Sequence, residues 1–437
     1  MKIAMVRCTP RLLLEDLHLE LRASGFTVDV IVIPGDPSFD IAETLRKVHP
    51  DMVLSVNLIE GLGRVCASLG LPYVVWEIDP NLWVPAAPSA EEAAWTHLFT
   101  WRRRHILRYR MDGYIHLAHL PLAASVRRRF RLGSTSGSGG FFAEAFPISF
   151  AGSSIVRGEG EAEGRLARQA LAARLSRCRG SESVWKWDRF VEVLHHALKL
   201  QHEHPCRNLY FSTLEKGLRE LGLSPLVEVE GRRMDLCIAF GRGLAAMRRL
   251  RVLDAVAEHE PRVFGDDGWE RVLRFPLRYG GRLENGAPLN ALYNGSWINL
   301  DIARLYQPDI VTLRVFDILA AGGFPLVESS DELPSLFELG TEVATWHDRE
   351  SLRHAVRTFL EQPERRLAFV ERGRARLFAE HTIAHRLVTM MEVLIDRGVL
   401  HEVPGLDRLR WAANHAEEIS CKASRDYASS ASSCRRS

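Results

Sequence analysis

Short apolar runs alternate with amphipathic stretches through the first 125 residues of the chain. The runs have the length and the branched composition of buried strands, and the stretches between them carry apolar residues at helical spacing. Five runs follow one another: KIAMVR, FTVDVIVIPG, DMVLSV, LPYVVWEID and YIHLAHLP. Short strands that alternate with helices are typical of a parallel sheet covered on both faces. The pattern therefore predicts an α/β domain with a parallel sheet over residues 1–132.

A second α/β domain is predicted over residues 147–398. The run FPISFAGSS has the pattern of an opening strand, and strands and helices alternate again after PLVESS. From about 160 to 230 the chain is rich in Arg, Glu and Ala, which predicts an inserted helical segment. Residues 133–146 include GSTSGSGG, the composition of a flexible link. Residues 399–437 are predicted to form a tail whose end is disordered.

The composition narrows the class of protein. Of the 437 residues, 46% are hydrophobic and 26% charged, as in ordinary globular domains. The net charge of +2 argues against a nucleic-acid binder. The first strand–helix junction, VRCTPRL, lacks GxGxxG, which disfavours a nicotinamide or flavin cofactor. The seven cysteines form no CxxC pair and no apolar run could cross a membrane, so we predict a cytoplasmic protein without an integral membrane segment.

Two α/β domains predict a ligand cleft at the carboxyl ends of their strands, and one stretch offers the chemistry for it. RVFDILAAGGFPLV, residues 314–327, predicts a short helix whose N-terminal amides suit a diphosphate. Arg314 adds a forked, charged contact, and Asp317 can accept two ribose hydroxyls. The alternative is an i,i+3 ion pair between Arg314 and Asp317 on a solvated face. Gly322 and Gly323 are predicted to cap the helix.

Candidate catalytic groups lie near other predicted strand ends. Asp79 follows LPYVVWEID and is a candidate base, and His119 lies near the end of YIHLAHLP. Asp309 precedes Asp317 by seven intervening residues, so both acids could face one pocket. The alternatives are an Asp-Pro turn for Asp79, a structural role for His119 and chance spacing for Asp309. GDDG, residues 265–268, predicts a turn.

A metal site is not expected from the sequence. No DxD follows a predicted strand to hold a cation on a diphosphate. His381 and His385 are four residues apart on a predicted helix, but no third ligand accompanies them. We therefore predict neither a metal nor a cofactor.

Several ordered motifs resemble one known family. The stretches YNGSWINLDIAR, LRVFDILAAGGFPLV and RGRARLFAEHTIAHR resemble the C-terminal domain of the CgeB-like, spore-maturation-type bacterial glycosyltransferases. VVWEIDPN, YIHLAHLPLA and FPISFAGS are similar to the domain that precedes it. The resemblance implies a GT-B fold, in which two Rossmann-like domains face a central cleft and the second holds a nucleotide-sugar donor without a metal.

The resemblance also implies roles for particular residues. Donor binding is expected from Tyr293, Asn294, Asn299, Arg304, Arg314, Asp317, Gly322 and Gly323, and catalysis from Asp79, His119 and Asp309. The expected activity is that of a hexosyltransferase, which moves a sugar from a nucleotide diphosphate to a hydroxyl of a glycan, lipid or protein. The alternatives are a nucleotide-sugar epimerase of the same architecture and a non-catalytic assembly protein.

Overall fold

A computed structural model describes residues 1–8, 12–34, 39–79, 82–127, 145–155, 159–178, 181–204, 209–307 and 309–421. Contacts divide the chain into two units. Unit 1 comprises residues 1–79, 85–138 and 375–437, and unit 2 comprises residues 80–84 and 139–374. The predicted flexible link and the end of the predicted tail fall largely outside the described residues.

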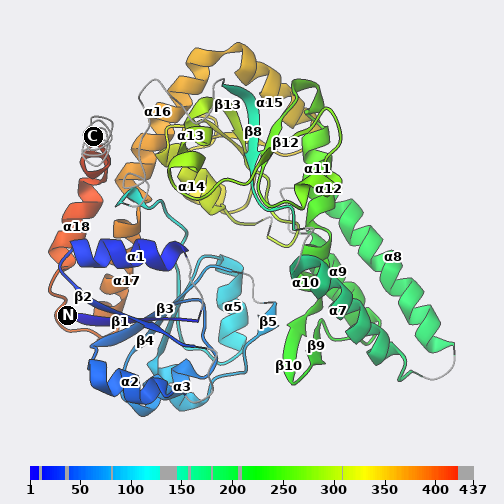
Figure 1. Cartoon of the computed structure of the whole chain (residues 1–437). Helices are drawn as coiled ribbons and strands as arrows, with labels where there is room; N and C mark the ends of the chain where they lie inside the picture. The colour runs from blue at the N-terminus through cyan, green and yellow to red at the C-terminus, as the bar shows by residue number, and fades with distance from the viewer. Residues whose placement is uncertain are drawn as a thin grey trace. The chain divides into compact units, whose positions relative to one another are not determined.

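Unit 1 is built on one parallel sheet with the strand order β2-β1-β3-β4-β6-β7. Figure 1 labels β1 to β4 of this sheet. Its strands are β1 (Lys2–Arg7), β2 (Thr27–Val32), β3 (Met52–Val56), β4 (Tyr73–Glu77), β6 (Thr96–Thr100) and β7 (His116–His119). The connecting helices are α1 (Leu12–Ala23), α2 (Ile41–Val48), α3 (Leu62–Ser68), α4 (Ala90–Trp95) and α5 (Arg103–Met111). Side chains of α2, α3 and α5 share one buried cluster with the sheet. All five predicted strands are present, and β6 is an additional one.

The C-terminal helices belong to unit 1 rather than to the second domain predicted from the sequence. Helix α16 (Pro363–Glu380) leads into α17 (Ile383–Asp396) and α18 (Leu406–Asn414). The Arg386 guanidinium donates to the carbonyl oxygens of Pro121 (2.8 Å) and Leu122 (3.0 Å), and Thr382 pairs with Ala124. These bonds fix α17 on unit 1, so the boundary near residue 375 differs from the predicted one at 398.

Unit 2 contains a second parallel sheet with the order β12-β11-β8-β13-β14-β15. Its strands are β8 (Phe146–Ala151), β11 (Arg262–Phe264), β12 (Arg278–Gly281), β13 (Ser296–Leu300), β14 (Pro325–Glu328) and β15 (Ala344–Trp346). Helices α11 (Ala245–Asp254) and α15 (Arg349–Glu361) pack on one face, while α13 (Ala287–Gly295) and α14 (Leu313–Ala320) pack on the other. The α/β class with two Rossmann-like parallel sheets is therefore confirmed.

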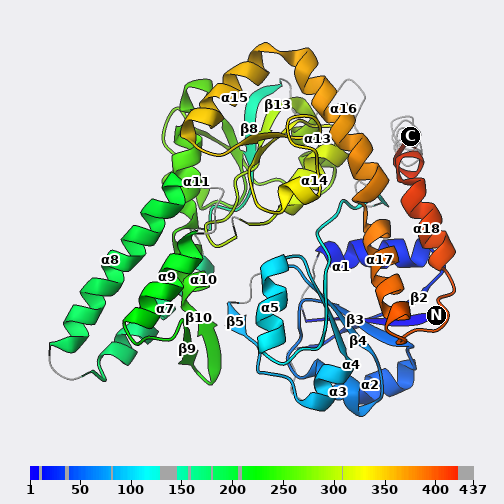
Figure 2. The ribbon, with the colours of Figure 1, turned by 180° about the vertical axis from the view of Figure 1, so that it is seen from behind.

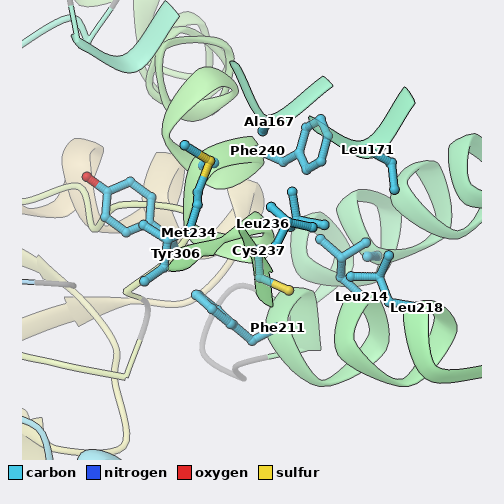
Figure 3. Close-up of a cluster of buried hydrophobic side chains, with 14 of the residues drawn as sticks. Ala167, Leu171, Phe211, Leu214, Leu218, Met234, Leu236, Cys237, Phe240 and Tyr306 are labelled. Atoms are coloured by element: carbon cyan, nitrogen blue, oxygen red, sulfur yellow. The ribbon is translucent and has the colours of Figure 1, made fainter. Parts of the chain in front are cut away.

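A helical segment of unit 2 has a core of its own, drawn in Figure 3. It consists of α7 (Glu159–Leu175), α8 (Glu182–Glu203), α9 (Leu209–Glu220) and α10 (Leu236–Gly243). The antiparallel strands β9 (Leu226–Val229), β10 (Arg232–Asp235) and β5 (Trp83–Val84) adjoin it and were not predicted. Buried Gln201 joins α8 to α9, because its side-chain oxygen accepts from the amides of Leu209 and Tyr210. Seen from behind in Figure 2, α8 extends well beyond the sheet of unit 2.

No helix in the described part of the chain is both long enough and apolar enough to span a membrane.

Candidate functional site

The carboxyl edge of the unit 2 sheet gathers charged side chains from three elements. Strand β8 ends at Ala151, β13 ends just before Asp301, and α14 begins at Leu313. Arg314, in the first turn of α14, donates from Nε to the Ala151 carbonyl and from Nη1 to Asp301 Oδ1, both at 2.7 Å. The predicted alternative, an Arg314–Asp317 pair, is therefore not needed to explain Arg314. Its ion pair joins it to buried Asp301.

A second arginine reaches the same strand exit from α11. Arg249 is 2% exposed and donates from Nη1 to the carbonyl oxygen of Ser153. Its guanidinium carbon lies 5.5 Å from the centre of the Phe150 ring, and that of Arg314 lies 4.9 Å from the same centre. Two guanidinium groups therefore share one aromatic ring and the loop that follows β8.

Four arginines stand at this edge, and among the described residues two of them pair with a carboxylate. We call Arg248, Arg249, Arg304 and Arg314 the arginine cluster. Arg248 pairs with buried Glu328, and Arg314 pairs with Asp301. Among the described residues, Arg304 has the Tyr306 hydroxyl (3.2 Å) and ring as its partners, and Arg249 has the Ser153 carbonyl and the Phe150 ring. The cluster therefore carries positive charge that the described carboxylates do not balance.

The positive charges of the cluster affect the pKa of Arg249. Burial, followed by the positive charges of Arg314 and Arg304, lowers the pKa of Arg249 to about 9. Its Nε is buried and has no hydrogen-bond partner among the described residues. A buried cation with an unused donor is unfavourable until an anion satisfies it. An anionic ligand is the chemistry that this arrangement would accommodate.

The N-terminus of α14 also favours an anionic ligand. Thr312 occupies the N-cap position, but its hydroxyl donates to Asp301 Oδ1 (2.7 Å) and makes no capping bond to the helix. The amides of the first turn are thus left without the usual side-chain cap, next to Arg314. Helix amides and guanidinium groups at one strand edge suit a phosphate or diphosphate.

Asp266 shapes the loop that follows β8. Its carboxylate accepts hydrogen bonds from Ser153 Oγ (2.6 Å), the Ser154 amide (2.6 Å) and the Gly268 amide (2.9 Å). Burial alone would raise the pKa of Asp266, but these hydrogen bonds together outweigh it and lower the pKa. The predicted turn at GDDG is confirmed, and it has the further task of holding the loop in place.

The structure separates the predicted donor-binding residues into two groups. Helix α14 runs back across the sheet, so its N-terminus lies at the carboxyl edge and its C-terminus at the amino edge. Arg314 therefore lies at the carboxyl edge, and Arg304 lies in the loop that follows β13. Asp317 is buried within α14. The other group lies at the amino ends of β13 and β14 or inside the sheet: Tyr293, Asn294, Asn299, Gly322 and Gly323.

These five residues have structural tasks that explain them. Asn299 is 1% exposed, and its Nδ2 donates to the Tyr293 carbonyl (2.9 Å) while its Oδ1 accepts from Ser149 Oγ (3.0 Å). Asn294 Nδ2 donates to the carbonyl of Ala321 at the end of α14 (3.1 Å). Gly322 has a φ of 80°, as the predicted helix cap requires. These contacts give several of the five residues a structural role, and the donor role predicted for them stays a prediction.

Gly323→Ala is expected to lower the free energy of unfolding by about 2 kcal/mol through overpacking. A Cβ on Gly323 would lie 2.3 Å from the Tyr293 carbonyl oxygen and 2.9 Å from Asn299 Nδ2, so backbone must move. Urea denaturation measures the change. Gly295→Ala is the control for an added methyl group without crowding, because a Cβ there meets nothing within 4 Å. Equal losses in both variants would show that close packing at Gly323 does not matter.

The three predicted catalytic residues fall in both units, and their roles stay predictions. In unit 1, Asp79 follows β4 and accepts a hydrogen bond from Asn57 Nδ2 (2.9 Å). His119 ends β7, and its Nε2 lies 3.3 Å from the carbonyl of Trp101. Thr100 of β6 pairs with both Glu77 and His119, so Asp79 and His119 lie at one sheet edge. Asp309 is a half-buried turn residue of unit 2.

The histidine pair considered for a metal has neighbours of its own in unit 1. His381 Nδ1 lies 3.0 Å from Arg386 Nη2, and His385 Nδ1 lies 2.7 Å from Thr382 Oγ1. Burial, followed by the charge of Arg386, lowers the pKa of His385 to about 4. These contacts join the residues just before α17 to the first turn of α17. The prediction that the protein uses no metal stays a prediction.

Sequence reasoning missed half of the arginine cluster. Arg248 and Arg249 belong to the run RRLR in α11, and nothing in that run marks it as part of a site. Asp301 and Glu328 directly follow or end strands, at β13 and β14. A search of every strand end for charged residues would have found both acids, but not the arginines that reach them from a helix.

A family model matches the part of the chain that carries the arginine cluster. Residues 248–392 match the family model described as glycosyl transferase-like. This segment is similar to that family. It covers about a third of the chain, and all four arginines of the cluster, Asp301 and Glu328 lie inside this glycosyltransferase-like segment. A comparison with curated proteins finds no match.

Several solved structures are similar to most of this chain at low sequence identity. A glycosyltransferase from Rickettsia africae is 10% identical, with 90% of this chain and 98% of that chain covered and a TM-score of 0.47. Anabaena HepE, in complex with UDP and glucose, is 10% identical, with 91% and 100% covered and a TM-score of 0.48. Sucrose-phosphate synthase from Thermosynechococcus elongatus is 11% identical, with 91% and 99% covered and a TM-score of 0.47.

Proposed function

We propose that the protein is a GT-B glycosyltransferase that transfers a sugar from a nucleotide diphosphate to a hydroxyl acceptor. The observation that carries the proposal is the arginine cluster at a strand edge of the glycosyltransferase-like segment. Its unbalanced positive charge fits the diphosphate of such a donor, whose two phosphate groups carry the negative charge that the site lacks.

In this proposal the cluster stabilises the leaving group. As the bond between sugar and diphosphate breaks, negative charge grows on the diphosphate oxygen, and fixed cations nearby favour that change. We propose that Arg304 and Arg314 contact the diphosphate directly and that Asp317 binds the ribose. Arg249 contributes positive charge from its buried position. The CgeB-like subfamily, a hexose as the sugar, and activity without a metal belong to the same proposal.

Arg304→Gln tests the diphosphate role with little risk to the fold, because the Arg304 side chain bonds only Tyr306 among the described residues. We expect the dissociation constant for a nucleoside diphosphate to rise about ten-fold or more, the worth of one charged hydrogen bond. Calorimetric titration over a panel of nucleoside diphosphates measures it. Arg357→Gln, an exposed arginine of α15, is the matched control.

The same panel can overturn the proposal. We expect nucleoside diphosphates to raise the unfolding midpoint, and the parent nucleosides to leave it unchanged, because bound ligand stabilises the folded protein. If no diphosphate binds, the non-catalytic alternative replaces the proposal. Incubation of the donor without an acceptor distinguishes the other alternative, since an epimerase would release an altered nucleotide sugar. Activity retained in a chelator is expected if the arginines supply the charge.

A further inference from the structure

Figure 1 labels helix α5 of unit 1. One face of this helix exposes apolar side chains. Leu107 is 64% exposed, Met111 is 79% exposed and Ile115, just beyond the helix, is 63% exposed. Leu107 and Met111 are four residues apart and so lie on the same helix face. The opposite face carries the buried side chains of His105 and Tyr109. The side chains that pack α5 onto unit 1 therefore do not include Leu107, Met111 and Ile115, which stay exposed.

Basic side chains surround the exposed apolar residues. Arg103, Arg104 and Arg110 are all exposed, and Arg108 is half-buried on the same helix. Asp112 is the single acid between residues 101 and 116. Burial and then the charges of Arg102, Arg108 and Arg104 hold the pKa of His105 well below its usual range. The helix surface therefore combines aliphatic side chains with a local excess of positive charge.

We propose that the α5 face, defined as Arg103, Arg104, Leu107, Arg110, Met111 and Ile115, docks on an anionic lipid surface. Arginines favour the negatively charged headgroups, and aliphatic side chains favour the boundary between headgroups and acyl chains. A nucleic acid would accept the arginines through its phosphates, but it offers no apolar layer to Leu107 and Met111. The combination of both kinds of side chain on one face therefore favours a membrane.

The α5 face would hold the protein at a membrane surface without spanning the membrane. Three aliphatic side chains and a few arginines give shallow, reversible binding that depends on salt. This property concerns a surface of unit 1 and is separate from the diphosphate site of unit 2. It would bring the enzyme to acceptors located at anionic membranes.

Vesicle sedimentation of the full chain tests the proposal. We expect binding to vesicles of equal parts phosphatidylglycerol and phosphatidylcholine, weaker binding in high salt, and little binding to phosphatidylcholine alone. Each arginine removed should lower the partition coefficient about five-fold, so the combined change R103Q/R104Q/R110Q should lower it about 100-fold. L107Q/M111Q should lower it to a similar extent, about ten-fold for each side chain.

Controls separate docking from unfolding and from other partners. Val184→Gln removes an apolar side chain that is 63% exposed on α8 and should leave vesicle binding unchanged. The variants should keep the unfolding midpoint and the nucleotide affinity of the unchanged protein, because they alter exposed side chains. The proposal is overturned if the unchanged protein ignores anionic vesicles or if the variants bind them equally well. Binding to DNA in place of vesicles, or a dimer that the variants break, would also overturn it.

Discussion

Arg314→Ala is expected to lower the free energy of unfolding by about 3–5 kcal/mol, because it leaves a buried carboxylate without its cation. The side chain of Asp301 is 3% exposed, and its Oδ1 accepts from both Arg314 and Thr312. Removal of the guanidinium also removes the bond to the Ala151 carbonyl at the exit of β8. Chemical denaturation with two-state analysis measures the loss. The variant should also bind nucleoside diphosphates poorly, but the loss of stability would obscure that result.

A double variant separates the structural and binding roles of Arg314. Asp301→Asn combined with Arg314→Met removes both charges, so no isolated carboxylate remains and most of the stability should return. Diphosphate binding should not return, because the cation and its forked donors are still missing. Calorimetric titration of the double variant decides the question. Normal diphosphate affinity in this variant would mean that Arg314 serves the fold alone, and the proposed phosphate contact would then be wrong.

The periodicity of the sequence was enough to predict two α/β units with parallel sheets, although not every strand of either sheet. Buried parallel strands are continuous apolar runs, and β3, β4 and β6 are buried along their whole length, although β6 itself was missed. The sequence THLFT of β6 contains a histidine and two threonines, so its pattern is weak. Small residues at helix ends were also informative, since Gly322 has the left-handed conformation that a cap requires.

The candidate site was only partly accessible from the sequence. Arg314 and its helix start were found because a strand, a loop and a helix follow one another along the chain. Gly323 follows Arg314 closely in the sequence, yet helix α14 between them carries the chain to the opposite edge of the sheet, where Gly323 lies beside Asn299. Arg249 comes from a helix that precedes β11, and only the packing of α11 against β8 brings it to Phe150. Sequence proximity is a poor guide where helices cross a sheet.

The boundary between the units also depended on contacts that sequence does not show. Residues near Arg386 continue the helical pattern of unit 2 without a change in composition. Their hydrogen bonds, however, go to carbonyl oxygens near residue 121, about 265 positions earlier in the chain. Such a return of the C-terminal helix to the first unit is a tertiary property.

Arg249→Met is expected to raise the free energy of unfolding by about 1–3 kcal/mol while it lowers diphosphate affinity roughly ten-fold. A stabilising substitution that impairs binding is what a buried functional cation predicts. Arg386→Met is the matched control, because Arg386 is also buried and its pKa is also lowered, to about 10. Arg386 donates to three carbonyl oxygens, so its replacement should destabilise the protein and leave nucleotide binding unchanged.

The pH dependence gives the Arg249 prediction its sharpest test. The pKa of Arg249 is lowered to about 9 in the folded protein, from an ordinary value of 12.5. Below the folded pKa the guanidinium is charged in both states, so its burial opposes folding; as pH rises through about 9, the folded protein releases the proton first and this opposition weakens. The stability advantage of Arg249→Met should therefore be largest near about pH 7 and smaller near about pH 10. Urea midpoints of both proteins across that range measure the difference, and an advantage that stays constant with pH would show that the buried charge is not its cause.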